Sequence, residues 1–297
     1  MPSNASAHAR RIWEVVEPIA AAAYFAPEAH AAYEALGFKG SGGAANGLQF
    51  PDMVAYFLSR GACLGKVQGE VIAAAFGVFK REMVVDAVDR GWDICGDPAP
   101  VLAARQDGTT AALERVLGTE PEGMKRATEL LLRAAAAAPG EGRHLFSGLQ
   151  SLGLPGTPMG DFWRAADLVR EHRGDSHIAA WIGADLDACE IGVITDVWRG
   201  APVKSWVRSR GWSNDEMDGA VERLRGRDLL RGDAISPAGW EMREGIDLAT
   251  DLMESRVVDA LGDDIDELFA IMDPIAAKAV EGRLYPAAVA WGQRPES

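Results

Sequence analysis

The hydrophobic residues of this chain recur mainly three and four positions apart, and glycine or proline repeatedly interrupts the pattern. This spacing places apolar side chains on one face of a helix, and glycine and proline mark where helices end or begin. The predicted helices cover residues 8–37 (bent at Pro18 and restarted at Pro27), about 51–60, 64–79, 81–90 and 99–107, a segment from Thr109 or Thr110 to Gly118, and Pro121 to Ala138. Two glycine-rich stretches, 38–50 and 140–160, are predicted to be loops, the second a domain boundary or a lid.

The stretch that follows combines a helical pattern with an unusual density of polar groups. Asp161 is predicted to cap a helix whose buried face carries Phe162, Ala165, Val169 and His172. Gly174 is predicted to end that helix. Asp175 or Ser176 would then cap the next one, and a capping box at Asp187 and Glu190 predicts a further helix that reaches Arg199.

The last hundred residues show a different order of elements. A short helix over 203–209, a turn at Gly211 and a helix capped at Ser213 are followed by a tight hairpin over 229–236, with Gly232-Asp233 at its tip, and by a long helix from Pro237. This is the order of a winged helix-turn-helix. The predicted fold is therefore mainly α, with a helical N-terminal domain and a C-terminal winged helix-turn-helix that contains a short β-hairpin.

Residues 199–255 resemble the winged-helix core of the multiple-antibiotic-resistance-regulator superfamily. The resemblance rests on Leu224, Asp228-Leu229-Leu230, Gly232, Ile235-Ser236 and Gly239, with Asp228 in the place of the usual glycine. Over most of its length the chain also resembles actinobacterial helix-turn-helix-containing proteins of unknown function, through Arg60-Gly61-Ala62, Leu64-Gly65, the segment 170–177 and the C-terminal segment. These resemblances imply a fold and no activity.

Length and composition indicate a globular protein with two domains. The chain has 297 residues, of which 48% are hydrophobic and 25% charged. Because a single core rarely serves so long a chain, a helical ligand-binding domain over 1–195 and a winged-helix-like domain over 196–297 are expected. No apolar run is long enough to cross a bilayer, and the three cysteines are far apart, which is typical of a reducing compartment. The expected location is the cytoplasm, with no membrane partner.

The distribution of charge argues against nucleic-acid binding. The net charge is −14, which repels a polyanion at long range. Residues 199–231 carry eight basic and five acidic side chains, but residues 232–267 carry two basic and eleven acidic ones. A recognition helix presents its N-terminal residues to the DNA groove, and here that end carries Asp215, Glu216 and Asp218. The winged helix is therefore expected to serve packing or dimerisation, which allows a homodimer.

The segment from Arg170 to His177 contains the best candidates for chemistry. His172, Asp175 and His177 are the candidate catalytic residues, since imidazole and carboxylate groups at a helix break can act as general acid and base. The alternative roles are a core histidine for His172 and a helix cap for Asp175. No metal is assigned, because histidines five positions apart do not match a one-helix zinc motif. The candidate ligand-binding residues are Tyr24, His30, Arg60, Arg173 and Trp181.

The sequence favours a protein that binds a small molecule, anionic or aromatic in character, near residues 170–177. The first alternative is an enzyme that applies histidine and aspartate acid–base chemistry to a small metabolite. The second alternative is a ligand-responsive transcriptional regulator. No cofactor is identified by any motif, and the expected partner is the small-molecule ligand rather than nucleic acid.

Overall fold

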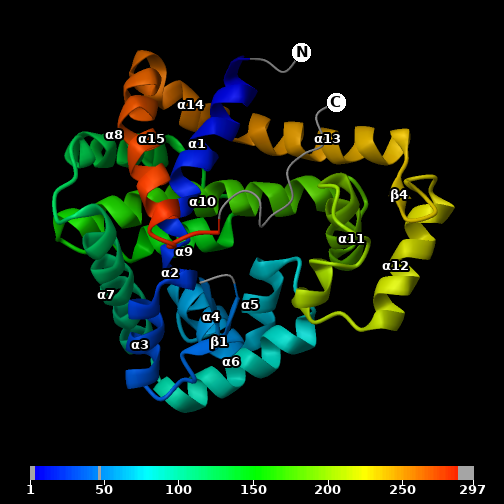
Figure 1. The fold of residues 1–297 in the computed structure, drawn as a ribbon, viewed down its shortest axis with the longest axis horizontal. Helices are drawn as coiled ribbons and strands as arrows, with labels where there is room; N and C mark the ends of the chain where they lie inside the picture. The colour runs from blue at the N-terminus through cyan, green and yellow to red at the C-terminus, as the bar shows by residue number, and fades with distance from the viewer. Residues whose placement is uncertain (1–3, 46–47, 287–297) are drawn as a thin grey trace.

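Helices make up most of the computed structural model, which describes residues 4–45 and 48–286, and two small antiparallel hairpins complete it (Figure 1). The N-terminal helices are α1 (Asn4–Ala20), α2 (Ala22–Phe25), α3 (Pro27–Ala35), α4 (Met53–Gly61), α5 (Gly69–Phe76), α6 (Arg81–Cys95), α7 (Pro98–Leu117), α8 (Met124–Ala137) and α9 (His144–Ser151). The later helices are α10 (Pro158–Gly183), α11 (Ala188–Trp198), α12 (Asn214–Gly226), α13 (Pro237–Met253), α14 (Ser255–Leu261) and α15 (Ile265–Glu281). Three 3-10 turns, η1 (Ala62–Leu64), η2 (Val207–Arg210) and η3 (Gly262–Asp264), lie between them.

Helix α10 is the central element, and other helices surround it (Figure 1). Thr157 caps its N-terminus by accepting a hydrogen bond from the Gly160 amide at 3.2 Å. Helices α1, α7, α8, α9 and α13 all pack against it. Most of its residues are buried as a result, polar ones included. The buried polar side chains of α10 are therefore fixed by packing on several sides.

Buried apolar residues form two clusters rather than one. The larger combines residues between 9 and 169 with residues 257–284, so α14 and α15 pack with the N-terminal helices. The smaller contains residues between 180 and 246 and includes the end of α10, α11, α12 and the start of α13. The smaller cluster begins at residue 180 and ends at residue 246, so neither limit coincides with the domain boundary expected at residue 195. Helix α10 contributes to both clusters and connects them.

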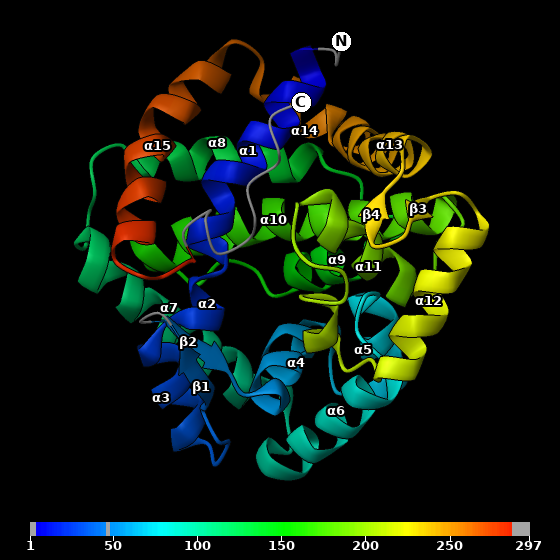
Figure 2. The same ribbon diagram turned by 45° about the vertical axis from the view of Figure 1, so that its right-hand side comes forward.

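The C-terminal elements follow the predicted order, except that the helix expected over 203–209 is replaced by the 3-10 turn η2. Strands β3 (Leu230–Arg231) and β4 (Ala234–Ile235) pair as a hairpin between α12 and α13, at the right-hand edge of the view in Figure 1 and nearer the viewer in Figure 2. The predicted capping box at Asp187 with Glu190 is present, and the predicted cap at Ser213 forms a second capping box with Glu216. Local sequence signals were sufficient here because each element is short and its ends are marked by polar caps.

The predicted helix break at Gly174 was wrong. Helix α10 runs through residue 174 without interruption, and Gly174 does not have the positive φ of a helix-ending glycine. Glycine costs only about 1 kcal/mol in a helix, which the packing of α10 outweighs. Asp175 is consequently a mid-helix residue and not a cap. Asp161 accepts a hydrogen bond from the Gly156 amide instead of capping α10.

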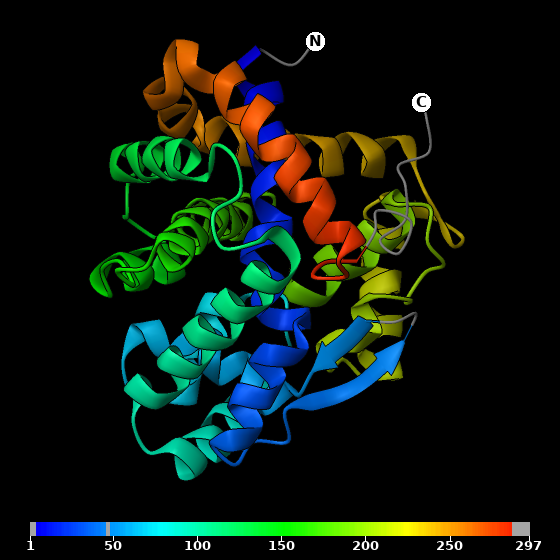
Figure 3. The ribbon, with the colours of Figure 1, turned by 60° about the vertical axis from the view of Figure 1, so that its left-hand side comes forward.

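Three further expectations needed correction. The predicted loop at 140–160 contains α9, and the one at 38–50 contains a hairpin of β1 (Ser41–Ala45) and β2 (Leu48–Pro51), drawn as arrows in Figure 3. The two helices expected on either side of residue 108 are one helix, α7. Gly108 packs there directly against α3, where a Cβ would lie 2.5 Å from the Ala29 Cα. Close helix packing, rather than a turn, explains this glycine. No helix among residues 4–45 and 48–286 is long and apolar enough to span a membrane.

Candidate functional site

Glu171, in the middle of α10, is the centre of a buried network of charges. Arg60 donates to its two carboxylate oxygens at 2.8 and 2.7 Å, and Arg170 donates to Oε1 at 2.8 Å. The Tyr24 hydroxyl donates to the same carboxylate at 3.4 Å. Burial alone would raise the pKa of Glu171, but the charges of Arg170 and Arg60 outweigh it and hold that pKa well below its usual value. Glu171 is therefore ionised, and it orients two arginines.

A second buried ion pair lies one helical turn earlier. Asp167 receives hydrogen bonds from Arg105 at 2.7 and 3.1 Å, and both side chains are inaccessible to solvent. Arg105 also lies over the Trp163 ring, 4.9 Å from its centroid. Asp167, Glu171 and Asp175 are spaced by four, so one stripe of α10 carries three buried carboxyl groups. The first two are paired with arginine and the third is not.

Asp175 connects α10 to α9. Its carboxylate accepts a hydrogen bond from the Phe146 amide in the first turn of α9, at 3.0 Å. Burial and the nearby charge of Glu171 raise its pKa to about 7. The predicted role as the cap of a helix that follows Gly174 was wrong, and Asp175 instead accepts from an amide of another helix, α9.

Aromatic rings adjoin the Glu171 network. Tyr24 packs edge-on to Tyr56 with centroids 5.2 Å apart, and Tyr56 lies 5.9 Å from Phe79. Arg60 donates to the Tyr56 hydroxyl at 3.1 Å. Arg210, from η2, places its guanidinium 4.4 Å from the Phe79 centroid and 5.1 Å from that of Trp206. These rings contact one another in a row that links the N-terminal helices to the helix-turn-helix segment.

Arg199 and Arg210 differ from the other arginines of this region. Both are half-buried, yet neither side chain makes an ion pair or a hydrogen bond with residues 4–45 or 48–286. Burial lowers the pKa of each guanidinium, and positive neighbours add to this effect, Arg243 for Arg199 and Arg60 for Arg210. We call the following set the arginine–aromatic cluster: Arg60, Arg170, Arg199, Arg210, Tyr24, Tyr56, Phe79 and Trp206.

The predicted catalytic histidines occupy two different environments. His172 is fully buried, contacts Glu254 through Nδ1 at 2.7 Å and packs edge-on to Phe146, while its Nε2 has no partner among the described residues. His177 is half-buried, with Nδ1 3.2 Å from the Thr250 hydroxyl. Burial and the charge of Arg243 lower its pKa to about 3. Because α10 continues through residue 177, no helix N-terminus lies at His177.

The predicted ligand-binding residues are only partly brought together. Tyr24 and Arg60 meet at Glu171. His30 is buried and bonds to Gln49 and to the Tyr24 carbonyl oxygen. Arg173 pairs with Asp251 at 2.8 Å, and Trp181 is buried against Gly77 with its Nε1 unpartnered within the described chain.

Sequence reasoning did not single out Arg199, Arg210 or Tyr56. Neither Arg199 nor Arg210 was proposed as a site residue, because neither belongs to a local motif. The spacing of Asp167, Glu171 and Asp175 by four on an apolar helix was the available signal, since buried carboxylates require partners. This spacing could have indicated that charged groups are buried in the core, but not which arginines pair with the carboxylates.

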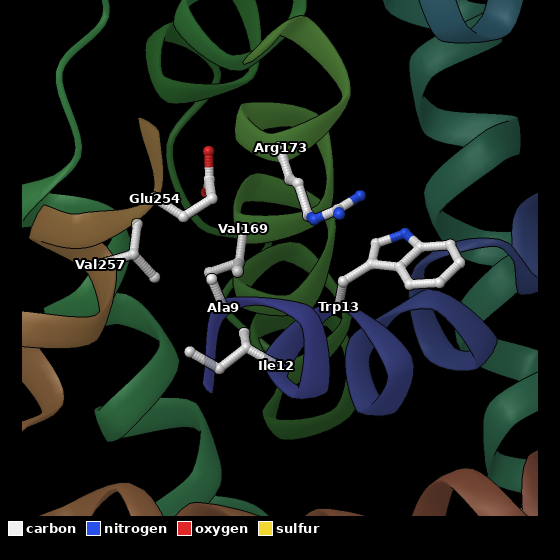
Figure 4. Close-up of a pocket in the computed structure, with 7 residues that line it drawn as sticks. All are labelled: Ala9, Ile12, Trp13, Val169, Arg173, Glu254 and Val257. Atoms are coloured by element: carbon white, nitrogen blue, oxygen red, sulfur yellow. The ribbon is translucent and has the colours of Figure 1, made fainter. Parts of the chain in front are cut away.

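The surface has two hollows near these residues. One is a crevice beside Glu254 that a water-sized molecule cannot enter; Arg173 points from it toward the Trp13 ring, away from Glu254 (Figure 4). The other is a groove of about 520 Å³ between the β2–α4 junction and α6, with Phe50, Met53 and Met83 in its wall. It ends at Ser209, next to Arg210 in the chain, and Phe50 packs against Phe25 beside Tyr24. Of these two hollows, the groove is the one large enough for a small molecule, and it adjoins the segment that carries Arg210.

A helix-turn-helix family model matches residues 9–286, which is nearly the whole chain. The chain belongs to this helix-turn-helix family. The match includes the N-terminal helices as well as the helix-turn-helix segment, so the family is defined by the entire architecture. Neither a curated protein nor a solved structure matches the chain. Within the described residues, no group of three or more histidine, cysteine, aspartate or glutamate side chains is placed to hold a metal ion.

Proposed function

We propose that this helix-turn-helix protein binds a small organic anion with a flat apolar part at the arginine–aromatic cluster. The observation that carries the proposal is the pair Arg199 and Arg210, two half-buried guanidinium groups without a carboxylate partner in the described chain. Burying an uncompensated charge is unfavourable, and a bound carboxylate or phosphate would compensate it. Guanidinium groups bind both anions with two parallel hydrogen bonds.

The rings of the cluster account for the apolar part of the ligand. Tyr56, Phe79 and Trp206 are contiguous with the guanidinium of Arg210. Aromatic faces stack on flat ligands and contribute apolar contact area. The neighbouring groove of about 520 Å³ lies within the range of small-molecule sites.

In this proposal the C-terminal part is a winged helix that serves packing or dimerisation and does not read DNA. The N-terminus of α12, which would enter a groove, is docked against the N-terminal helices: Glu216 pairs with Lys80 at 2.7 Å, and the Trp212 Nε1 donates to the Val78 carbonyl oxygen at 3.2 Å. The arginines of this region also have internal acceptors. Arg223 pairs with Asp187 and Glu190, Arg225 with Glu222 and Asp233, and Arg231 with Asp228. Contacts with phosphates would compete with these pairs.

Acid–base catalysis at His172 is not part of the proposal. Its ring is sealed between Glu254 and Phe146, and no space for a substrate adjoins it. The cytoplasm remains the proposed location.

Native mass spectrometry with added phenylacetate, phenyl phosphate and phenethylamine tests the proposal. The three probes share a ring and differ in charge. We expect one bound molecule per chain for the two anions and none for the amine, with the adducts lost in Arg199→Gln and retained in Arg208→Gln, an exposed neighbouring arginine. Equal binding of all three probes, or anion adducts that survive Arg199→Gln, would show that the cluster is not the site.

A further inference from the structure

One face of α13, which lies along the margin of the molecule (Figure 1), is open to solvent. Helices α1, α10 and α11 pack against its other side. Beyond the first turn of α13, the exposed positions are Glu241, Gly245, Leu248 and Leu252, at spacings of four, three and four. Two helices that pack along each other use this spacing for the residues between them. We call these four residues, together with Arg256 one turn further on in α14, the α13 stripe.

The middle of the α13 stripe is apolar and flat. The side chains of Leu248 and Leu252 are 40% and 52% exposed and lie one turn apart. A Cβ built at Gly245 would meet no atom within 4 Å, and this residue does not have a positive φ. Neither packing within the described chain nor backbone conformation therefore requires a glycine that weakens the helix. A second helix that approaches α13 closely at this position accounts for it.

Opposite charges flank this apolar part. Glu241 precedes Leu248 by seven positions, and Arg256 follows it by eight. Helical hydrogen bonding resumes immediately after the irregular residue Glu254, whose carbonyl oxygen accepts from the Val258 amide at 3.1 Å, so Arg256 continues the α13 stripe. Both charged side chains are exposed, and neither forms a hydrogen bond or an ion pair with any part of the chain that the structure describes. They are available to a partner.

The order of residues along the α13 stripe is complementary to itself. When two copies lie antiparallel about a two-fold axis beside Leu248, Glu241 of one copy comes opposite Arg256 of the other, and Gly245 comes opposite Leu252, because the members of each pair are equally far from the axis. The two Leu248 side chains meet at the axis. A parallel arrangement would place like charges opposite each other.

We infer that this protein forms a two-fold symmetric dimer in which the α13 stripes of two copies pack antiparallel. The inference rests on the dimerisation role that the proposed function gives to the winged helix, and it names the face and the partner. A second copy supplies the complementary charge, the leucine opposite the glycine and the correct spacing without any further requirement. The α13 stripe shares no residue with the arginine–aromatic cluster, so the dimer and the anion site can be tested separately.

Sedimentation equilibrium tests the inference at protein concentrations of about 10 to 300 μM, because so short an apolar contact predicts a micromolar dissociation constant. A salt concentration of about 0.15 M screens the repulsion between two chains of net charge −14. We expect a monomer–dimer equilibrium for the wild type and a monomer for Leu252→Glu. The matched control Leu154→Glu, which changes an exposed leucine between α9 and α10, should dimerise like the wild type.

Charge reversal tests the antiparallel arrangement. Glu241→Arg and Arg256→Glu should each raise the dissociation constant of the dimer about tenfold, since each turns both symmetry-related ion pairs into repulsions. The double variant Glu241→Arg/Arg256→Glu should dimerise like the wild type. The melting temperatures of all variants, measured at a concentration where the wild type is monomeric, should agree, because every change lies at an exposed position.

A wild type that is monomeric throughout the concentration range would overturn the inference and leave the proposed anion site standing. A dimer that persists in Leu252→Glu would show that another face makes the contact. Failure of the double variant to recover the affinity lost in the two single variants would contradict the antiparallel pairing.

Discussion

Among the described residues Arg199 has no carboxylate partner for its half-buried charge, so its removal should help folding and harm binding. In a chloride buffer without organic anions, Arg199→Gln should leave the free energy of unfolding unchanged or raise it by roughly 1 kcal/mol, because the cost of burying the charge disappears. Urea denaturation measures this difference. A loss of more than about 1 kcal/mol would indicate a structural role for this arginine.

Glu171, unlike Arg199, is expected to stabilise the folded state, because it is the carboxylate partner of two largely buried arginines. Glu171→Gln should lower the free energy of unfolding by about 3–5 kcal/mol, because Arg60 and Arg170 lose the carboxylate that both share. The matched control is Glu267→Gln, which breaks an exposed pair with Arg126 and should cost less than about 1 kcal/mol. Similar values for the two variants in urea denaturation would contradict this account of the network.

At the scale of elements, Asp175 makes the attachment of α9 to α10 depend on pH. Burial and Glu171 raise its pKa from 3.8 to about 7 in the folded protein. The folded state therefore binds the proton more tightly than the unfolded state, so this contribution to stability is complete below pH 4 and is lost as the pH rises through 7. Phe146 and Leu145 amides and Arg60 act on the same carboxyl in the opposite direction.

Asp175→Asn keeps an acceptor for the Phe146 amide but cannot ionise. The free energy of unfolding of this variant minus that of the wild type should increase by about 2 kcal/mol from pH 5 to pH 8. Urea denaturation of both proteins at the two pH values gives the difference. A constant difference across this range would show that Asp175 is already ionised at pH 5.

The docked α12 leads to a prediction about DNA. Its N-terminus is held by Lys80 and Val78, and its arginines are paired internally. We therefore expect no sequence-selective binding when genomic fragments are tested by gel shift at about 0.1 M salt, where real phosphate contacts remain measurable. Sub-micromolar, sequence-selective complexes would show that α12 is released from the N-terminal helices.

Elements whose ends are marked by local chemistry could be predicted from the sequence. The capping boxes at Asp187 and Ser213 and the Gly232-Asp233 hairpin are examples. Gly174 and Gly108 misled the prediction because tertiary packing, which no local pattern reveals, carries the helix through both positions. For the site, the sequence indicated Tyr24, Arg60 and the segment 170–177. It could not indicate that Arg199 and Arg210 lack partners, because that depends on where distant carboxylates lie.

At the scale of the whole molecule, α10 joins the two apolar clusters, and the arginine–aromatic cluster draws residues from both sides of this junction. Arg60 and Tyr56 come from α4, whereas Arg199 and Arg210 come from the helix-turn-helix segment. A ligand that contacts both sides would stabilise their association by its binding free energy. The family match, which extends over both parts, is consistent with a site that needs the complete chain.

The central claim, that an organic anion neutralises Arg199 and Arg210, is tested most directly by calorimetric titration of phenyl phosphate into the wild type, Arg210→Gln and Arg208→Gln. We expect binding of one molecule per chain to the wild type and to Arg208→Gln with equal affinity, and a dissociation constant at least about tenfold higher for Arg210→Gln, as the loss of one charge-assisted contact requires. Equal affinities for all three proteins, or an absence of binding to the wild type, would contradict the account.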